Sequence, residues 1–284
     1  MTGVDLLVVG GTGLLGRAVV EQAAAEGRSI AATYHSSTPI GEADWHQVDI
    51  RLVDDLAGVI ARLRPRAIIN AAYVNRGDDL FEVTTRAPSV MAGGAEHYGS
   101  RFVHVSTDIV FDGQLGRPYE EADPVSPVNA YGRAKAEAED AIFSYDASTV
   151  AVRTSLLWGG SGDGGPQVRL LRDPAVKFFT NEIRNPLRVD RLAAVCLELC
   201  DRPEITGVLH AGGEDAVDRL TFARALAPLA RVDPAELNGI EAEFRPDRPA
   251  DVRLDSSLAR HLLAAPLPGI HTDAPHVTLG TNPA

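Results

Sequence analysis

The sequence predicts an α/β fold, in which a doubly wound parallel sheet is followed by a smaller C-terminal lobe. Short apolar runs alternate with helical patterns through about residue 155, which is typical of parallel strands joined by right-handed crossovers. A glycine-rich loop directly after the first apolar run indicates the same arrangement. Beyond this point the periodicity loosens, and we expect helices over 191–200 and 221–230 and a strand over 208–211. The stretch 159–166 and the tail from Pro266 are predicted to be loosely held loops.

The glycine-rich loop is predicted to bind a dinucleotide. It lies between an apolar strand, Asp5–Val9, and a helical stretch, Arg17–Ala25. Gly10 permits a tight turn, Gly13 lets the backbone approach a pyrophosphate, and Gly16 allows the helix to pack closely on the strand. The helix N-terminus adds free amides and the positive end of its dipole. The residues expected to contact the cofactor are Gly10, Thr12, Gly13, Leu14, Leu15, Gly16 and Arg17. A turn with a purely structural purpose is the alternative.

The end of the second strand bears on which dinucleotide is bound. The strand 29–33 is followed by Tyr34, His35, Ser36 and Ser37. Proteins that prefer NAD normally place an acidic residue here, against the ribose hydroxyl, and this chain has none. Small hydroxyls and a histidine could accept a 2′-phosphate, and Arg17 could add positive charge. We therefore expect NADP, with NAD as the alternative.

Two later strands are expected to complete the cofactor site. Asp49 and Ile50 follow the strand 45–48, at a place where such folds often hydrogen-bond the adenine. The strand 67–70 ends in Asn70, Ala71 and Ala72. Small side chains there let the chain pass close beneath a cofactor, although Asn70 could equally be a strand cap.

Tyr131 and Lys135 carry the strongest indication of chemistry. Asn129 is predicted to begin a helix, and a spacing of four residues places the phenol and the ammonium on one face of it. A cation within a few ångströms would favour the phenolate and lower the pKa of the phenol. Tyr131 is therefore the candidate proton donor and Lys135 the group that tunes it. The alternative is a half-buried aromatic residue beside a solvated lysine.

Thr107 and Asp108 follow the strand-like run 101–105, and open parallel sheets hold their ligands at the carboxyl ends of strands. The Thr107 hydroxyl could hydrogen-bond a substrate carbonyl and stabilise charge on its oxygen. Asp108 could orient a hydroxyl or a water molecule, or it could serve only as a loop cap.

Several segments resemble the extended short-chain dehydrogenases/reductases. They are Gly10–Gly16, Ser106–Gly113, Tyr131–Glu139 and Arg153–Ser155 followed by Trp158 and Gly159. Within that class, the pattern is similar to the dTDP-4-dehydrorhamnose reductase branch, and Arg248–Leu258 resembles the end of its substrate-binding part.

The resemblance implies a Rossmann domain over residues 1–155 that binds the dinucleotide. It implies a smaller substrate-binding lobe over 156–284, parts of which return to the sheet. It also implies that Thr107, Tyr131 and Lys135 act together in the NAD(P)H-dependent reduction of a nucleotide-linked 4-keto-6-deoxy sugar. The chain departs from the branch at Ile109 and Leu156, which replace the usual tyrosine and tryptophan of the sugar pocket. Further departures are Thr84, where asparagine is common, and the segments 73–83 and 159–172.

Composition and charge limit the partners. A formal charge of −12 repels nucleic acid and anionic lipid. No apolar run reaches the ~18 residues that span a membrane, and the N-terminus shows no leader, so we expect a cytoplasmic protein. The diphosphate of a nucleotide sugar would need local cations, for which Arg248 and Arg253 are the candidates. Cys196 and Cys200 are expected to pack as small apolar side chains, and no metal site is predicted.

Three classes of function remain open from the residues. The first is the reductase. The second is a non-catalytic NADP-binding regulatory subunit, since the regulatory subunit of methionine adenosyltransferase has a similar glycine loop and tyrosine–lysine pair. The third is an epimerase or dehydratase on the same scaffold, which would keep its cofactor through the cycle. A homodimer is compatible with each of them.

Overall fold

The computed structural model describes residues 3–160, 165–243 and 246–274. Its centre is a seven-stranded sheet of order β11-β6-β5-β4-β1-β2-β3, in which every neighbouring pair is parallel. The strands are β1 (Leu6–Val9), β2 (Ile30–Tyr34), β3 (Asp44–Gln47), β4 (Ala67–Asn70), β5 (Arg101–Thr107), β6 (Thr149–Thr154) and β11 (Gly207–Ala211). The chain starts in the middle of the sheet and winds outwards to each edge in turn, so the predicted Rossmann-type fold is confirmed.

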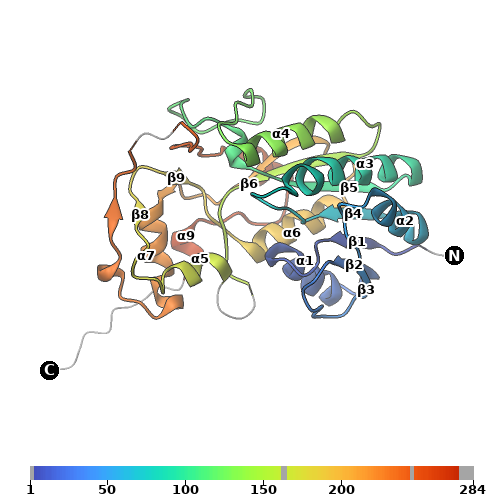
Figure 1. Ribbon diagram of the computed structural model, residues 1–284, viewed down its shortest axis with the longest axis horizontal. Coiled ribbons are helices and arrows are strands. Elements are labelled where there is room, and N and C mark those ends of the chain that lie inside the picture. The colour runs from blue at the N-terminus through green and yellow to red at the C-terminus, as the bar shows by residue number, and fades with distance from the viewer. Residues whose placement is uncertain (1–2, 161–164, 244–245, 275–284) are drawn as a thin grey trace.

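Helices cover both faces of the sheet (Figure 1). α1 (Leu14–Ala25) and α6 (Val189–Cys200) pack together on one face. α2 (Val53–Leu63), α3 (Ala87–Tyr98) and α4 (Ala130–Ile142) lie on the other. The strands are therefore buried on both sides, as parallel strands usually are.

Strand β1 illustrates how the sequence sets the two cores. Leu6 and Val8 point into the core beneath α1 and α6, while Leu7 and Val9 point into the core beneath α2 and α3. Successive side chains of a strand alternate between faces, so an uninterrupted apolar run fits a strand covered on both. Burial of each such side chain contributes roughly 1.5–3 kcal/mol.

A smaller lobe lies beyond the carboxyl ends of β5 and β6 (Figure 1). Its strands are β7 (Leu157–Trp158), β8 (Phe178–Phe179), β9 (Ile183–Arg184), β10 (Leu187–Arg188), β12 (Val217–Asp218) and β13 (Gly239–Ile240). Its helices are α5 (Gly165–Leu170), α7 (Arg219–Ala230) and α9 (Ile270–Asp273), and it contains the short helical turn η3 (Pro234–Glu236). α8 (Ser257–Leu262) packs against β11 instead. Two other short turns lie in the first part of the chain: η1 (Glu82–Arg86) before α3 and η2 (Asp108–Val110) after β5. Trp158, Phe178 and Phe222 centre the separate core of this lobe.

Three elements from the second half of the chain belong to the central layers. α6 packs beside α1, β11 pairs with β6 from Gly207 opposite Val150 to Ala211 opposite Thr154, and α8 packs against β11. The division of the chain at residue 155 therefore stays a proposal. In that division the second part contributes two helices and one strand to the layers of the first.

The expected tail is only partly loose. α9 forms within it, and Ile270 is fully buried against the lobe core, because apolar residues at the end of the chain fill the space beside α7. Residues 275–284, and 161–164 of the predicted loop, lie outside the described residues. Cys196 is buried in the core beneath α6, as predicted, and both cysteines are free thiols. Among the described residues, no helix combines the length and apolarity needed to cross a bilayer.

Candidate active site

A cleft of about 270 Å³ opens at the carboxyl ends of β1, β2 and β4, where the strand order reverses direction. In open α/β sheets this switch point is the usual ligand site. Most of the predicted cofactor contacts line it together: Gly10, Thr12, Gly13, Tyr34, His35, Asp49, Ile50, Ala71 and Ala72.

The glycine loop has the conformation that its sequence predicts. Gly10 has a φ of +84°, and a Cβ there would lie 2.8 Å from the backbone of Ala72. A Cβ on Gly16 would lie 2.1 Å from the Gly10 carbonyl oxygen. Only glycine fits at either position without moving backbone. The loop therefore offers a close backbone surface and the α1 N-terminus to a pyrophosphate.

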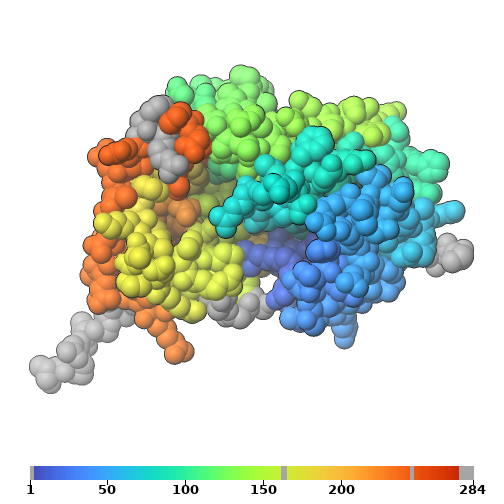
Figure 2. All heavy atoms as spheres, in the orientation of Figure 1, coloured from blue at the N-terminus to red at the C-terminus, as the bar shows by residue number. Residues whose placement is uncertain are grey.

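The other residues predicted to bind the cofactor lie around the cleft rather than in its wall. Leu15 and Gly16 are buried in the packing of α1, and Ser36 and Ser37 are exposed beyond the wall. Leu14 and Arg17 line a second cavity between α1 and α5, also of about 270 Å³, together with Arg169. The molecular surface is hollowed between the blue N-terminal part and the yellow part that includes α5 (Figure 2). Arg17 thus faces away from Tyr34 and His35, and its predicted contact with a 2′-phosphate stays a prediction.

Arg51 is a cation of the cleft that the sequence analysis missed. Its guanidinium contacts Asp49 at 2.6 Å and Asp79 at 3.0 Å, and it shares the cleft wall with His35. Hydrogen bonds from Arg51 lower the pKa of Asp49 to about 2. The position of an arginine two residues beyond Asp49, at the end of a strand, was the available signal.

Asn70 is buried at the end of β4 and fixes the position of Ala72, which lines the cleft. Its Oδ1 accepts a hydrogen bond from the amide of Ala72 at 3.1 Å, and its Nδ2 contacts Nδ1 of His104 at 3.1 Å. Burial and the nearby charge of Lys135 hold the pKa of His104 well below its ordinary value. The neutral imidazole therefore supports the Asn70 amide from β5, and Asn70 in turn fixes the turn after β4.

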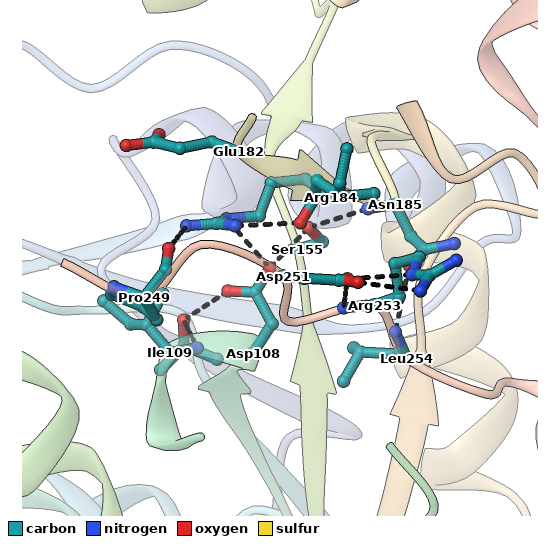
Figure 3. A network of polar contacts seen from close by, with 12 residues as sticks. Asp108, Ile109, Ser155, Glu182, Arg184, Asn185, Pro249, Asp251, Arg253 and Leu254 are labelled. Atoms are coloured by element: carbon teal, nitrogen blue, oxygen red, sulfur yellow. Dashed lines mark hydrogen bonds and ion pairs between the residues drawn. The ribbon is translucent and has the colours of Figure 1, made fainter. Parts of the chain in front are cut away.

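Thr107 is the last residue of β5, and Asp108 after it meets the lobe (Figure 3). Thr107 Oγ1 donates to Asp108 at 3.3 Å, and Ser155 Oγ donates to the other carboxylate oxygen at 2.6 Å. The bond from Thr107 is long, and such bonds are weak, so this hydroxyl remains available for a substrate oxygen. Burial raises the pKa of Asp108.

Arg184, also absent from the sequence prediction, connects Asp108 to the lobe (Figure 3). Its Nε lies 3.8 Å from Asp108 Oδ2. Its other nitrogens donate to the carbonyl oxygens of Ile183, Ala250 and Pro249, each at 2.8 Å. This buried guanidinium therefore joins β9, the segment around Pro249 and the end of β5.

Tyr131 is half-buried at the start of α4, where Asn129 caps the helix by accepting a hydrogen bond from the amide of Gly132. Its ring lies 6.0 Å from the ring of Tyr73. Burial raises the pKa of the Tyr131 phenol, and Tyr73 and Asp108 add to this shift. The direction is opposite to the lowering predicted from the spacing, because burial outweighs any effect of the ammonium in this arrangement.

Lys135 lies one turn along α4 and is fully buried. Its Nζ donates to the carbonyl oxygen of Val105 on β5 at 2.7 Å. Burial lowers its pKa to about 8, with an opposing effect from Glu139. Glu139 is itself paired with buried Arg153 at 2.6 Å. The lysine is therefore held beside β5, and its tuning of Tyr131 stays a prediction.

The two arginines predicted to hold a diphosphate both have carboxylate partners. Arg248 pairs with Glu182, and Arg253 pairs with Asp251 at 2.7 Å. The guanidinium of Arg248 also lies 4.5 Å over the ring of Phe179. Their roles toward a substrate stay predictions. To bind a diphosphate, each arginine would have to release its carboxylate partner or bind both groups at once.

The residues that depart from the expected pattern have packing partners of their own. Ile109 and Leu156 pack at the margins of two small cores. Thr84 Oγ1 donates to the carbonyl oxygen of Val74 at 2.9 Å and so holds the segment after β4 against η1. Tyr73 lines the cleft, and both Tyr73 and Phe81 of the same segment are exposed.

A doubly wound sheet with a cofactor-sized cleft at its switch point and a small lobe over its carboxyl edge is the architecture of the extended short-chain dehydrogenases/reductases. The family within that class is shown by comparison. A model of the RmlD substrate binding domain matches residues 4–278, and the chain belongs to this family. The predicted class, an NAD(P)-dependent oxidoreductase, is thereby confirmed.

Named relatives cover most of the chain. A probable low-salt glycan biosynthesis reductase of Haloferax volcanii is 31% identical, over 86% of this chain and 85% of that protein. The dTDP-4-dehydrorhamnose reductase of Mycobacterium tuberculosis is also 31% identical, over 86% and 81%. Methionine adenosyltransferase 2 subunit beta of Bos taurus is 26% identical, over 89% and 80%.

Solved structures have the same fold. A hypothetical dTDP-4-dehydrorhamnose reductase of Sulfolobus tokodaii superposes with a TM-score of 0.78 at 26% identity, over 93% of this chain and 96% of that one. The dTDP-4-dehydrorhamnose reductase of Bacillus anthracis, solved in complex with NADP, gives 0.78 at 20% identity, over 96% of both chains.

Proposed function

We propose that this protein reduces a nucleotide-linked 4-keto-6-deoxy sugar with NADPH, in the manner of a dTDP-4-dehydrorhamnose reductase. The close packing of the start of α4, which carries Tyr131, on the η2 turn that follows Thr107 is the observation that carries the proposal. Relatives named as a probable low-salt glycan biosynthesis reductase and a dTDP-4-dehydrorhamnose reductase support the substrate class.

The residues at the switch point fit a dinucleotide. Gly10 and Gly16 let the loop pack closely on the backbone around it, because a Cβ at either position would meet backbone atoms, and Asp49 lines the same cleft. Arg51 and His35 favour a 2′-phosphate, and the relative crystallised with NADP supports the same choice. When bound, the nicotinamide supplies the hydride to the ketone carbon.

The side chains of this chain would handle the proton. The raised pKa leaves the Tyr131 phenol in its neutral form, which carries the proton that the ketone oxygen would take, although burial makes it a weaker acid than a free tyrosine. Thr107 would turn its hydroxyl from Asp108 to the same oxygen and stabilise its developing charge. Lys135 would hold the nicotinamide ribose. To do so, its ammonium would leave the carbonyl oxygen of Val105 and bring its positive charge toward the phenol.

Tyr131→Phe tests the proton donor, because it keeps the ring and removes only the hydroxyl. We expect kcat for NADPH oxidation by a dTDP-4-keto-6-deoxy sugar to fall by about 10² to 10⁴, while the Kd for NADPH changes little. Tyr98→Phe on α3, away from the cleft, is the matched control and should keep kcat within about twofold. Turnover by Tyr131→Phe within about tenfold of the unaltered protein would reject the assignment.

A regulatory NADP-binding subunit is the second candidate, and the similarity to methionine adenosyltransferase 2 subunit beta favours it. The replacement of the expected pocket aromatics by Ile109 and Leu156 points the same way. Tight NADPH binding with no NADPH consumption across a panel of 4-keto sugar nucleotides would support this candidate. An epimerase or dehydratase would instead convert the sugar without net release of oxidised cofactor. Cytoplasmic location and a homodimer stay predictions.

A further inference from the structure

Arg219, the first residue of α7, has a guanidinium without a carboxylate partner. Within the described part of the chain, no acidic side chain lies within ion-pair distance of it. Its one hydrogen bond to a side chain is a long one, from Nη2 to Gln167 Oε1 at 3.3 Å. A guanidinium carries five N–H donors, so most of the donors on Arg219 remain free.

The surroundings of Arg219 make this lack of a partner costly. The side chain is half-buried, and burial lowers its pKa to about 10, with Arg184 and Arg248 acting in the same direction. Glu182 and Asp108 oppose the shift, but both are already engaged. A buried charge is normally paired, so this arrangement favours an incoming anion.

Its carboxylate neighbours are held by other residues. Glu182 receives two bonds from Arg248, and Asp108 receives the hydroxyls of Ser155 and Thr107. The neighbouring cation is equally occupied, since Arg184 donates to three backbone carbonyl oxygens. Compared with Arg184 and Arg248, Arg219 would therefore break the fewest existing hydrogen bonds on binding an anion.

The fold places Arg219 directly next to the predicted catalytic edge. β12, which leads into α7, pairs antiparallel with β9, so that Val217 lies opposite Arg184. Arg184 in turn reaches Asp108 at the end of β5 (Figure 3). In a nucleotide sugar the ketone at C4 and the phosphate at C1 lie at opposite ends of one ring. A cation on the lobe side of Asp108 suits the phosphate end.

We propose that Arg219 binds the diphosphate of the nucleotide-sugar substrate. Its planar fork can donate two parallel hydrogen bonds to one phosphoryl group. This inference rests on the proposed function for the identity of the ligand, but the anion site itself can be tested without turnover. It replaces Arg248 and Arg253 as the first candidate, because those arginines would have to give up carboxylates.

The test compares binding of dTDP and of inorganic pyrophosphate to Arg219→Met, Arg219→Lys and Arg224→Met by titration calorimetry. Arg224 is the matched control, since it is exposed on the same helix. We expect Arg219→Met to weaken dTDP binding by about 10- to 100-fold, as the loss of charge-assisted hydrogen bonds implies. Arg219→Lys should lie between, and Arg224→Met should bind within about twofold of the unaltered protein.

Two further readouts separate this role from a structural one and from cofactor binding. Arg219→Met should unfold at the same or a higher temperature, because it removes a half-buried charge that has no carboxylate partner. Its Kd for NADPH should be unchanged, since the cofactor diphosphate is expected over the glycine loop. A lower unfolding temperature together with weaker NADPH binding would overturn the proposal.

The possible failures are distinguishable. If dTDP binds Arg219→Met within twofold of the unaltered protein, the inference is wrong and the proposed reductase is untouched. If the unaltered protein binds neither dTDP nor pyrophosphate at millimolar concentration, the anion site does not exist. If both bind through Arg219 but no 4-keto sugar nucleotide oxidises NADPH, the anion site holds and the proposed reductase fails.

Discussion

At the scale of single residues, the electrostatics of the site differ from those suggested by spacing. Tyr131 and Lys135 lie one helical turn apart, yet the phenol has a raised pKa and the ammonium is bonded to a backbone carbonyl. Both groups are moved toward their neutral forms by burial. The neutral phenol carries a proton to give, but burial makes Tyr131 a weaker acid than a free tyrosine.

Lys135 gives a prediction for stability against pH. Its pKa is about 8 when folded and near ~10.4 when unfolded. Between these values the unfolded chain binds more protons, so this group makes folding more favourable as pH rises. Urea unfolding should show the stability of the unaltered protein rising relative to Lys135→Met from pH 8 to 10. The rise should approach roughly 3 kcal/mol at 1.36 kcal/mol per pKa unit.

Below about pH 7 the same comparison should be flat, because both states of the lysine are then protonated. The comparison with Lys135→Met cancels Tyr131, Cys196 and Cys200, whose raised pKa values act in the opposite direction at high pH. A difference that stayed constant from pH 6 to 10 would show that Lys135 is solvated in solution.

Each of the residues missed by sequence analysis has at least one partner in a distant segment. Arg51 meets Asp79 across 28 positions of the chain, and Arg184 meets Pro249 across 65. A local sequence pattern does not reveal pairs of residues that lie so far apart in the chain. The glycine loop, Thr107 and Asn129 were predictable because their geometry is set by residues within one turn of the chain.

At the scale of elements, the α1 helix depends on the close approach of its first turn to the glycine loop. A Cβ on Gly16 would lie 2.1 Å from the Gly10 carbonyl oxygen. We therefore expect Gly16→Ala to lower the free energy of unfolding by about 1–3 kcal/mol or more, as overpacking does. It should also weaken NADPH binding, because the loop must shift.

Gly58 in α2 provides the control, since nothing lies within 4 Å of a Cβ built there. Gly58→Ala should raise stability by about 0.5–1 kcal/mol through helix propensity and leave NADPH affinity unchanged. Thermal melts and fluorescence titration with NADPH measure both effects. Equal behaviour of the two variants would show that the loop tolerates a side chain.

The expected strands and helices of the sheet were predicted to within a few residues, because their apolar periodicity is local. The strand 67–70 agrees with β4, and the helix expected from Asn129 begins after its cap. The lobe was predicted less completely. Its strands β7 to β10 have two residues each, which is too short for any periodicity, and their pairing depends on contacts distant in sequence.

At the scale of the whole molecule, the two parts of the chain share one sheet. Without β11, strand β6 would become an edge, and without α6, the apolar face of α1 would meet water. We therefore expect a fragment of residues 1–155 to lack a cooperative thermal transition and to aggregate. The full chain, measured under the same conditions by circular dichroism and light scattering, is the control. A sharp transition of the fragment would establish residues 1–155 as an independent folding unit.

The two outer strands of the sheet bear on how copies of this chain could associate. β3 is four residues long, polar and exposed at Asp44 and Gln47, and short charged edges resist pairing with another strand. On the other side, the amide of His210 in β11 is already bonded to the Glu121 carboxylate at 3.0 Å. Joining two sheets into one continuous sheet is therefore disfavoured from both ends, and a dimer of this protein would form through helices or through the lobe.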